Sequence, residues 1–455
     1  MEVTQFTEEV FHLVEDLKHD LKDDHGKVKE FSDIVDGQGF QYVDIVMEGG
    51  GVLGVALVGF TYVLEQAGIR FLQIGGASAG AINAILLAGM GTPGEAKSVE
   101  ILQELANVDL HEFVDGDKDA RDFIEAAMRH GRSSFANSEG VIRGFIDGAF
   151  QKVGKARVYT QAAQVWDNIR DKLGLNPGDV FQDWIRNILK RKKISTTRDL
   201  LDRLNQLPEG LKHRSRTEPL DVKATVALIA ADVSTQTKAI FPKMAELYWK
   251  DPDKVNPSNY VRASMSIPFF FEPFRVNDIP KGEVAMSCWA KLADYKEALP
   301  RSCVFIDGGI MSNFPINLFH RPDRVPRSPT FGVKLGQDKK KTDTITQPLT
   351  LLSVIFDAAR FNLDSDFIAR NPDYRKLVSC IDTGDHNWLD FSLSDEAKID
   401  LFKRGATEAA KFLREFDWAK YKKIREGIST AIKRADLPEN GAGDAVMAPP
   451  VSSKS

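Results

Sequence analysis

Short apolar runs, each followed by a stretch with the pattern of a helix, recur along this chain of 455 residues. Runs this short and this apolar are typical of strands buried on both faces of a sheet, with the intervening helices covering those faces. The pattern therefore predicts an α/β fold. The clearest runs are Tyr42–Met47, Phe71–Ile74, Thr225–Ala230, Cys303–Ile306 and Thr330–Leu335.

The segments around these runs predict how the chain is divided. Residues 1–38 hold 11 acidic and 4 Lys or Arg side chains, and their apolar spacing predicts an amphipathic helix packed on the main domain, with a partner-binding arm as the alternative. We expect the main domain over 39–420, with a helical insertion at 95–220 where charged sequence interrupts the alternation. Residues 421–455 are expected to hold a helix end and a disordered tail. The apolar positions of the first segment are Phe6, Val10, Leu13, Leu17 and Leu21.

The composition excludes some classes of protein. The 60 basic and 65 acidic side chains give a net charge of −5, whereas a general nucleic-acid binder needs a basic excess to neutralise phosphates. The three cysteines show no metal-ligand spacing, so we expect no metal and no cofactor. No secretion signal is visible, and the longest apolar stretch, Ala77–Met90, contains Asn83 and is too short to span a bilayer. We therefore expect a cytoplasmic protein without a transmembrane segment.

A glycine-rich loop, Glu48–Gly54, follows the first apolar run. Between a strand and a helix, such a loop exposes backbone N–H groups, and the helix dipole adds positive potential. The spacing also matches the dinucleotide motif G-x-G-x-x-G, but that site needs an acidic residue at the end of the second strand. Phe71–Ile74 ends without one, so a dinucleotide site is the weaker alternative. The glycines of the loop are Gly49, Gly50, Gly51 and Gly54.

A G-x-S-x-G motif follows the second apolar run, at Gly76-Ala77-Ser78-Ala79-Gly80, and an apolar helix pattern begins directly after it. A serine on a sharp strand-to-helix turn projects its hydroxyl, and small residues two positions to either side prevent a collision across the turn. Ser78 is therefore the candidate nucleophile, supported by Gly76 and Gly80. A tight turn with a structural role is the alternative.

The candidate base is Asp307, which follows the fourth apolar run and precedes Gly308 and Gly309. A carboxylate at a strand end, flanked by glycines, can accept a proton from a serine; an aspartate that only shapes the turn is the alternative. Sites in open α/β sheets form outside the carboxyl ends of strands, so we expect the three loops to meet. Together they would supply a nucleophile (Ser78), a base and an oxyanion hole of N–H donors (Gly49–Gly51) for acyl transfer.

Histidine is the alternative base, because an ordinary α/β-hydrolase has Ser, then Asp or Glu, then His in chain order. Only His320 and His386 follow Asp307. His320 is predicted at a helix end or in the turn before a proline, and His386 in a polar turn, so each is expected at the surface. The sequence thus favours a Ser–Asp dyad, in which Asp307 takes the proton of Ser78 and later activates water.

The three motifs, in this order, resemble the patatin-like phospholipase family, whose signature is GGGxxG, then GxSxG, then DGG or DGA. The resemblance extends over about Gln41 to Phe416 and includes further similar segments. It implies a three-layer α/β fold with a central, mostly parallel sheet. It also implies a lipid acyl hydrolase of the phospholipase A or lysophospholipase type, a serine esterase with a Ser–Asp dyad and no metal requirement. The further similar segments are Ala231–Thr235, Arg262–Pro268, Asn313, Pro315 and a late stretch from Ile381 through Phe391 and Leu413, which is similar to the family's closing strand and helix.

One position departs from the family pattern. Many members carry Arg or Lys where this chain has Leu53, so the resemblance does not extend to a cation beside a phosphate headgroup. A non-catalytic lipid-binding module on the same fold is the alternative to a hydrolase.

A lipid substrate implies peripheral contact with a membrane. Phe269–Phe271 and Phe274 are expected to form a buried wall near the site, with a membrane-facing patch as the alternative. Lys190–Lys193 is expected to be a solvated helix end, with attraction to anionic lipid as the alternative.

Overall fold

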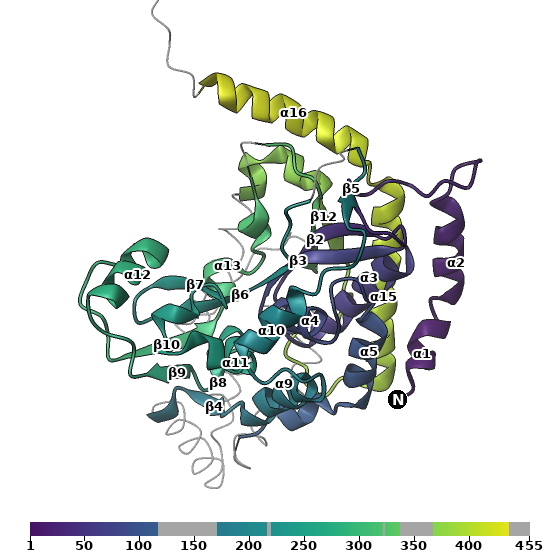
Figure 1. The fold of residues 1–455 in the computed structure, drawn as a ribbon. Helices are drawn as coiled ribbons and strands as arrows, with labels where there is room; N and C mark the ends of the chain where they lie inside the picture. Colours follow the sequence, from purple (N-terminus) through teal and green to yellow (C-terminus); the bar gives the residue numbers. More distant parts are fainter. Residues whose placement is uncertain (117–170, 216–219, 322–323, 337–366, 436–455) are drawn as a thin grey trace, which may run out of the picture.

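The structure, a computed structural model, describes residues 1–116, 171–215, 220–321, 324–336 and 367–435 (Figure 1). Its strands are β1 (Ile34–Val35), β2 (Gln41–Met47), β3 (Ile69–Ala77), β4 (Gly174–Asn176), β5 (Lys212–His213), β6 (Thr225–Asp232), β7 (Thr237–Phe241), β8 (Phe269–Phe271), β9 (Phe274–Asn277), β10 (Ser302–Asp307), β11 (Thr330–Leu335) and β12 (Val378–Ile381). The main sheet has the order β12-β11-β2-β3-β6-β10-β9. Its pairings from β12 to β6 are parallel, and those of β10 are antiparallel.

Helices pack against the sheet. The α-helices are α1 (Val3–Glu8), α2 (Phe11–Asp20), α3 (Gly54–Gln66), α4 (Ala79–Gly89), α5 (Ser98–Asn107), α9 (Asp179–Arg191), α10 (Thr197–Leu204), α11 (Ser258–Ser264), α12 (Glu283–Ala293), α13 (Gly309–Ser312), α15 (Asp395–Glu415) and α16 (Trp418–Ala435). The 3₁₀ helices are η1 (Gly51–Leu53), η2 (Leu110–Phe113), η3 (Ala245–Leu247), η4 (Pro252–Lys254), η5 (Ile316–Phe319) and η6 (Pro372–Lys376).

Two neighbouring glycines of β3 show what covers each face of the sheet. A Cβ on Gly76 would lie 2.4 Å from the carbonyl carbon of Gly80 in α4, whereas one on Gly75 would lie 2.6 Å from Leu318 Cδ1 in η5. Successive residues of a strand point to opposite faces, so α4 and η5 lie on opposite sides of the sheet. The predicted α/β class, with a central, mostly parallel sheet between two layers, is confirmed.

The five apolar runs all lie within strands of the main sheet. Thr330–Leu335 coincides with β11, and the other runs are shorter than the strands that contain them. The difference matters most at β3, which continues to Ala77 and so places Ser78 directly at the start of α4. The apolar pattern therefore located the strands but underestimated how far β3 extends toward the motif.

Helices α3 and α15 pack at very short range through a reciprocal pair of glycines. A Cβ on Gly59 of α3 would lie 2.0 Å from the Phe402 carbonyl oxygen of α15. One on Gly405 of α15 would lie 1.8 Å from the Ala56 carbonyl oxygen of α3. Both obstacles are backbone atoms of helices, which cannot move aside without separating the helices. Since α3 begins at the glycine-rich loop, this contact also positions that loop.

Gly405→Ala is expected to lower the free energy of unfolding by about 1–3 kcal/mol, because overpacking against backbone outweighs the gain of about 1 kcal/mol that alanine brings inside a helix. Gly427→Ala is the matched control, since a Cβ on this α16 residue would meet nothing within 4 Å. Urea unfolding of both variants should show opposite signs. A rise in stability of similar size for both would contradict the close packing of α3 on α15.

The N-terminal residues fold as two helices, α1 and α2, instead of the single helix predicted. Both lie beside α15 (Figure 1), where the rings of Phe6 and Phe402 meet at 5.5 Å and Lys403 Nζ lies 2.9 Å from a carboxylate oxygen of Glu9. These contacts show the packing on the main domain that the apolar spacing predicts. Of the predicted apolar positions, Phe6, Val10, Leu17 and Leu21 are buried, whereas Leu13 is only partly buried and its neighbour Val14 is buried.

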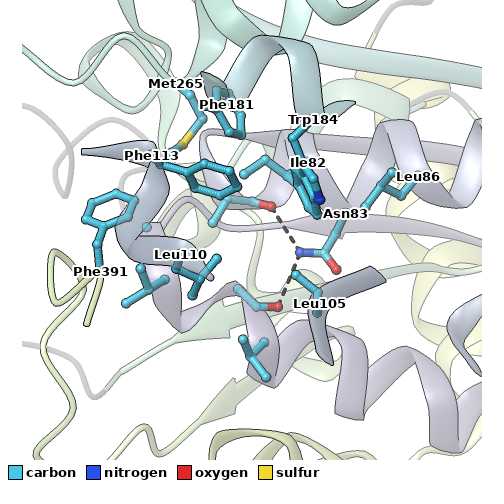
Figure 2. A pocket seen from close by; sticks show the side chains of 15 residues that line it. Ile82, Asn83, Leu86, Leu105, Leu110, Phe113, Phe181, Trp184, Met265 and Phe391 are labelled. Atoms are coloured by element: carbon cyan, nitrogen blue, oxygen red, sulfur yellow. Dashed lines mark hydrogen bonds between the residues drawn. The ribbon is translucent and has the colours of Figure 1, made fainter. Parts of the chain in front are cut away.

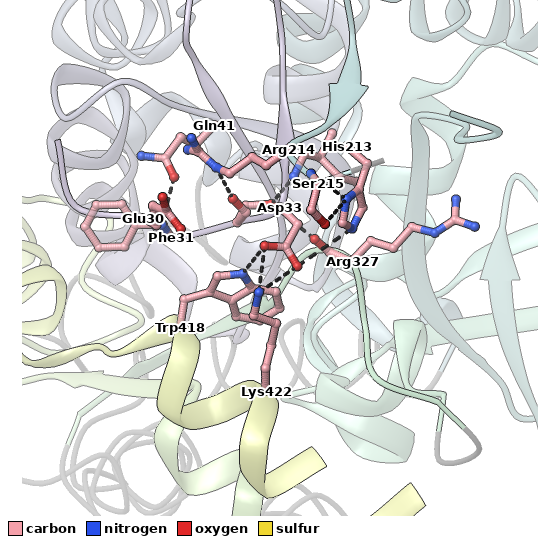
Figure 3. Close-up of polar contacts among 12 residues, drawn as sticks. Glu30, Phe31, Asp33, Gln41, His213, Arg214, Ser215, Arg327, Trp418 and Lys422 are labelled. Atoms are coloured by element: carbon pink, nitrogen blue, oxygen red, sulfur yellow. Dashed lines mark hydrogen bonds and ion pairs between the residues drawn. The ribbon is translucent and has the colours of Figure 1, made fainter. Parts of the chain in front are cut away.

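A buried carboxylate ties α16 to the N-terminal part of the chain (Figure 3). Trp418 Nε1 donates to Asp33 Oδ1 over 3.0 Å, and Lys422 Nζ lies 2.8 Å from the same oxygen. His213 Nε2 of β5 lies 3.8 Å from Asp33 Oδ2. Asp33 is only 8% exposed, so these donors compensate a charge that would otherwise be costly to bury. Helix α16 is thus anchored at its first turn and extends to Ala435.

The structure describes part of the predicted insertion at 95–220. Helices α5, α9 and α10 and the short strands β4 and β5 lie there, whereas residues 117–170 and 216–219 lie outside the described part of the chain. The predicted tail, from 436 onward, also lies outside it. The domain boundaries stay predictions.

Candidate active site

The glycine-rich loop follows β2 and leads through η1 into α3. Gly51 has φ = +53°, a left-handed conformation that favours glycine, and a Cβ there would lie 2.0 Å from the Trp388 carbonyl oxygen. The same carbonyl accepts the Val52 N–H over 2.9 Å. The loop is therefore held by a segment that lies far along the chain, within the late stretch that resembles the family.

Two N–H groups of this loop remain available to a ligand. The N–H of Gly49 donates to the Asn313 carbonyl over 3.0 Å. The N–H of Gly54 is used inside the loop, where it donates to the Gly51 carbonyl. Within the described residues, the N–H groups of Gly50 and Gly51 donate to no acceptor. Both belong to the glycines predicted to supply donors, and their role at an oxyanion stays a prediction.

Ser78 lies in a strained turn between β3 and α4. Its φ of 51° and ψ of −121° are rare for a residue other than glycine, and its side chain is buried. A Cβ on Gly76 would lie 2.4 Å from the carbonyl carbon of Gly80, and one on Gly80 would lie 2.2 Å from the Met47 carbonyl oxygen. The turn is tight enough to need both glycines, as expected for a G-x-S-x-G motif between a strand and a helix.

Asp307 lies level with the end of β3, but its strand runs in the opposite direction from the one expected. We expected the loops to meet at the carboxyl ends of parallel strands, but β10 is antiparallel to β6. The register pairs Ala77 with Ile229 across β3 and β6, and Ala230 with Asp307 across β6 and β10. Because Ile229 and Ala230 are adjacent, Asp307 stops level with the end of β3. Strand β6 extends three residues beyond Ile229, the partner of Ala77, to Asp232. Strand β10 pairs with this extension in the antiparallel direction and ends at Asp307.

The last residue of α11 and the residues just after it join the two motifs. Ser264 Oγ accepts the Ser78 N–H over 2.9 Å, and the Ser264 carbonyl accepts the Gly308 N–H over 3.1 Å. The Ser266 carbonyl accepts the Asp307 N–H over 2.8 Å. Sequence reasoning gave Ser264 no role; its one signal was a place in the segment that resembles the family. Ser264 positions the serine turn and the DGG turn relative to each other.

A buried arginine supports this segment. Arg262 is 3% exposed, and its guanidinium donates to Ser266 Oγ over 2.7 Å and to the Glu272 carbonyl over 2.7 Å. Burial lowers the pKa of Arg262 to about 10, so the group keeps its charge at neutral pH. Replacing it would leave the two acceptors beside the site without their donor.

The hydroxyl of Ser78 points to a thioether. Its Oγ donates over 3.1 Å to Sδ of Met265, a residue that is 2% exposed. Asp307, also 2% exposed, accepts the Gly309 N–H at Oδ1 over 2.8 Å. The sheet thus brings both members of the predicted dyad to one level, with the serine hydroxyl turned toward Met265.

The two histidines have other partners, and neither lies fully at the surface as predicted. His320 follows η5 and is half-buried, its Nδ1 lying 2.5 Å from the Tyr374 hydroxyl, and burial lowers its pKa. His386 Nε2 lies 2.8 Å from a carboxylate oxygen of Asp400. Each histidine is therefore held by the C-terminal part of the chain, because apolar and charged side chains from α15 and η6 close over these turns.

An apolar pocket adjoins Ser78, with Met265 and Ala79 in its lining (Figure 2). Its walls come from α3, α4, α5, η2 and α9, and the space inside is about 500 Å³ including its opening. Within this lining, the side-chain nitrogen and oxygen atoms belong to Asn83 and Trp184. A lining this apolar, with few polar groups, suits an apolar ligand.

Two residues of the run Phe269–Phe271 are buried next to the pocket, where they pack behind its lining. Phe270 and Phe271 are 3% and 1% exposed, and Phe270 stacks on Phe391 of the pocket at a ring-centroid distance of 4.8 Å. The predicted buried wall is confirmed for these two residues. A membrane-facing patch is wrong for them.

The basic cluster at the end of α9 is partly neutralised. Arg191 lies 2.6 Å from a Glu104 carboxylate oxygen, and Lys192 pairs with Glu100, both on α5. Lys190 and Lys193 are exposed. The prediction of a solvated helix end therefore fits Lys190 and Lys193. Arg191 and Lys192 instead form ion pairs with α5.

No helix in the described part of the chain is long and apolar enough to cross a membrane. No group of three or more His, Cys, Asp and Glu residues there could hold a metal ion.

The family model for patatin-like phospholipase matches residues 45–320. The chain belongs to this family. The match covers all three loops and supports a lipid hydrolase at the level of the family. It ends before Trp388 and Phe391, so the segment that holds the glycine-rich loop and completes the pocket lies beyond the part described by the family model.

Similar proteins come from several bacteria. The uncharacterized protein YqhO of Bacillus subtilis (strain 168) is 27% identical over 382 residues, which are 83% of this chain and 100% of that protein. VipD from Legionella pneumophila aligns in space with a TM-score of 0.37 and 15% identity, over 86% of this chain and 69% of VipD. A chain of the complex of SpcU with ExoU, from the type III secretion system of Pseudomonas aeruginosa, aligns with a TM-score of 0.29 and 15% identity, over 82% of this chain and 52% of that one.

Proposed function

We propose that this protein hydrolyses carboxylic esters of lipids, as a phospholipase A or lysophospholipase, with Ser78 as nucleophile and Asp307 as proton acceptor. The observation that carries the proposal is the register of β3, β6 and β10, which brings the strained serine turn level with a buried carboxylate. The two available N–H groups of Gly50 and Gly51 and the apolar pocket support the same chemistry.

In the first half of the reaction, Ser78 Oγ turns from Met265 and attacks the ester carbonyl while its proton moves to the Asp307 carboxylate. The N–H groups of Gly50 and Gly51 hold the resulting oxyanion, an interaction of the kind that contributes about 3–4 kcal/mol per donor in comparable sites. The N-terminus of α4 adds about 0.3–1 kcal/mol. The carbon–oxygen ester bond then breaks, and the leaving alcohol takes the proton from Asp307.

In the second half, water attacks the acyl-enzyme. Asp307 takes a proton from the water, and the same two N–H groups hold the second oxyanion. The bond between the acyl carbon and Ser78 Oγ breaks, the proton returns to Ser78, and a free carboxylic acid leaves. No metal or cofactor has a step in this scheme.

The apolar pocket determines which end of the ester substrate is bound inside the protein. The acyl chain lies among the apolar side chains of α4, α5 and α9, while the alcohol with its headgroup stays outside. Leu53, at the position of the family's cation, is 7% exposed and offers no charge to a phosphate. The substrate is then recognised through its acyl chain, and contact with a membrane is peripheral.

The test combines a covalent probe with a lipid panel. A fluorophosphonate should label the native protein at Ser78, identified by peptide mass, and mass spectrometry of a phospholipid, lysophospholipid and neutral-lipid panel should show release of a fatty acid. Labelling without turnover of any lipid would favour the non-catalytic lipid-binding module. Labelling at a serine outside the turn would remove Ser78 from the mechanism.

A further inference from the structure

We propose that the pocket beside Ser78 selects acyl chains that carry a hydroxyl group, which Asn83 recognises. This inference rests on the proposed function, since the pocket is taken to hold the acyl chain of the ester. It concerns a polar group placed inside an apolar pocket, a combination that a site for plain hydrocarbon chains does not need.

Asn83 presents a hydrogen-bond acceptor to the pocket. It lies on α4, is only 4% exposed and belongs to the pocket lining. Its Nδ2 donates to the Gly54 carbonyl over 3.3 Å and to the Ala79 carbonyl over 3.1 Å (Figure 2). These two bonds use both N–H groups and fix which atom of the amide is the oxygen. Among the described residues, no donor reaches Oδ1, so this oxygen of a largely buried side chain is left for a ligand.

The structure of α3 and α4 does not require an amide at this position. The carbonyls of Gly54 and Ala79 lie in the first turns of α3 and α4, so each already accepts a main-chain bond within its own helix. An apolar side chain would leave neither carbonyl without a donor. A donor on the ligand would form the hydrogen bond that Oδ1 lacks within the described residues.

The complementary group is a hydroxyl. Trp184 also lines the pocket (Figure 2), and its N–H donates to no acceptor within the described residues. An alcohol both donates and accepts, so it can satisfy Asn83 Oδ1 and also use an N–H donor. A ketone or ether on the chain only accepts and cannot serve the amide oxygen.

The helix geometry limits where on the chain the hydroxyl lies. Asn83 follows Ser78 by five positions on α4, a rise of roughly 7 Å, and its side chain bends back toward Ala79. The hydroxyl therefore sits on the half of the chain nearer the ester, not at its far end.

The experiment compares umbelliferyl esters of dodecanoic acid, of its 3-, 6-, 8- and 11-hydroxy analogues, and of the 6-oxo acid. At least one hydroxyl near the ester should raise kcat/KM by about 5–10-fold over the plain chain, as expected for one additional hydrogen bond. The oxo analogue and the 11-hydroxy chain should bring no gain. Equal kcat/KM for all chains would overturn the inference and assign Oδ1 to an ordered water.

Asn83→Leu should remove the preference, so that the ratio of kcat/KM between hydroxylated and plain dodecanoyl esters falls to about 1 within this variant. Leu86→Ala is the control: it enlarges the same pocket and should change chain-length preference, but it should keep the preference for a hydroxyl. A preference that survives Asn83→Leu would assign the recognition to another residue.

Direct binding separates this inference from the proposed function. Calorimetric titration of Ser78→Ala with dodecanoic acid and its 3- and 6-hydroxy analogues needs no turnover, and at least one hydroxy acid should bind about fivefold more tightly. If no ester is hydrolysed by the native protein but this difference is present, the proposed hydrolase fails and the hydroxyl site stands. If esters are hydrolysed and the difference is absent, only the hydroxyl site fails.

Discussion

Ser78→Ala is expected to lower ester hydrolysis by at least about 10⁴-fold, the scale of loss when a catalytic nucleophile is removed. The change deletes one oxygen atom and its 3.1 Å contact with Met265 Sδ, and it leaves the tight packing of Gly76 and Gly80 in place. Turnover should therefore vanish while the unfolding temperature stays close to that of the native protein. Both are measured on one preparation, by fatty-acid release and by thermal unfolding.

Ser258→Ala is the matched control for this loss. Ser258 is also a fully buried serine, and its Oγ makes no hydrogen bond within the described residues. Removing an oxygen without a partner should leave activity intact and leave stability unchanged or slightly higher. Residual activity of Ser78→Ala above about 1% of native would show that another group attacks the ester.

Asp307→Asn is expected to lower turnover by about 10²–10⁴-fold, the usual contribution of a general base. Asparagine keeps the shape of the side chain, and its amide oxygen can still accept the Gly309 N–H that Asp307 Oδ1 accepts over 2.8 Å. The negative charge and the ability to take a proton are lost. Steady-state rates with saturating substrate, beside circular dichroism to check the fold, separate a catalytic loss from a folding loss.

The histidines provide the opposing test. His320→Gln and His386→Gln should retain most of the activity, because His320 is bonded to Tyr374 and His386 to Asp400. An active Asp307→Asn, together with an inactive histidine variant, would replace the dyad by a serine–histidine pair. The fluorophosphonate probe adds a second readout, since a missing base should slow labelling at Ser78 as well as turnover.

Much of the local structure could be predicted because it depends on a few neighbouring residues. Apolar runs located the strands around the site, and the spacing of Gly76, Ser78 and Gly80 predicted a tight strand-to-helix turn that the backbone adopts. The sequence also predicted that the three loops would meet, but the argument took all three strands to be parallel. Strand β10 runs antiparallel, and the direction of a strand depends on how the chain returns to the sheet, which apolar patterns do not record.

The contacts of the site could not be predicted in the same way. Trp388 holds the glycine-rich loop through Val52, and Ser264 joins the serine and DGG turns. Both come from segments distant in the chain, and a carbonyl or a lone serine has no motif. Asn83 was visible in the sequence only as a polar break in an apolar stretch, and its neighbours in the pocket come from several helices.

By itself, the sequence determined the α/β class, the three loops and the residue types they carry, because backbone freedom, side-chain size and apolar periodicity act over short distances along the chain. Only the tertiary structure decided which N–H groups of the glycine-rich loop stay available, where the Ser78 hydroxyl points and what lines the pocket. Those outcomes depend on hydrogen bonds and packing between segments such as β2, α11 and the residues around Trp388. Such contacts exist only once the sheet has brought its distant strands together.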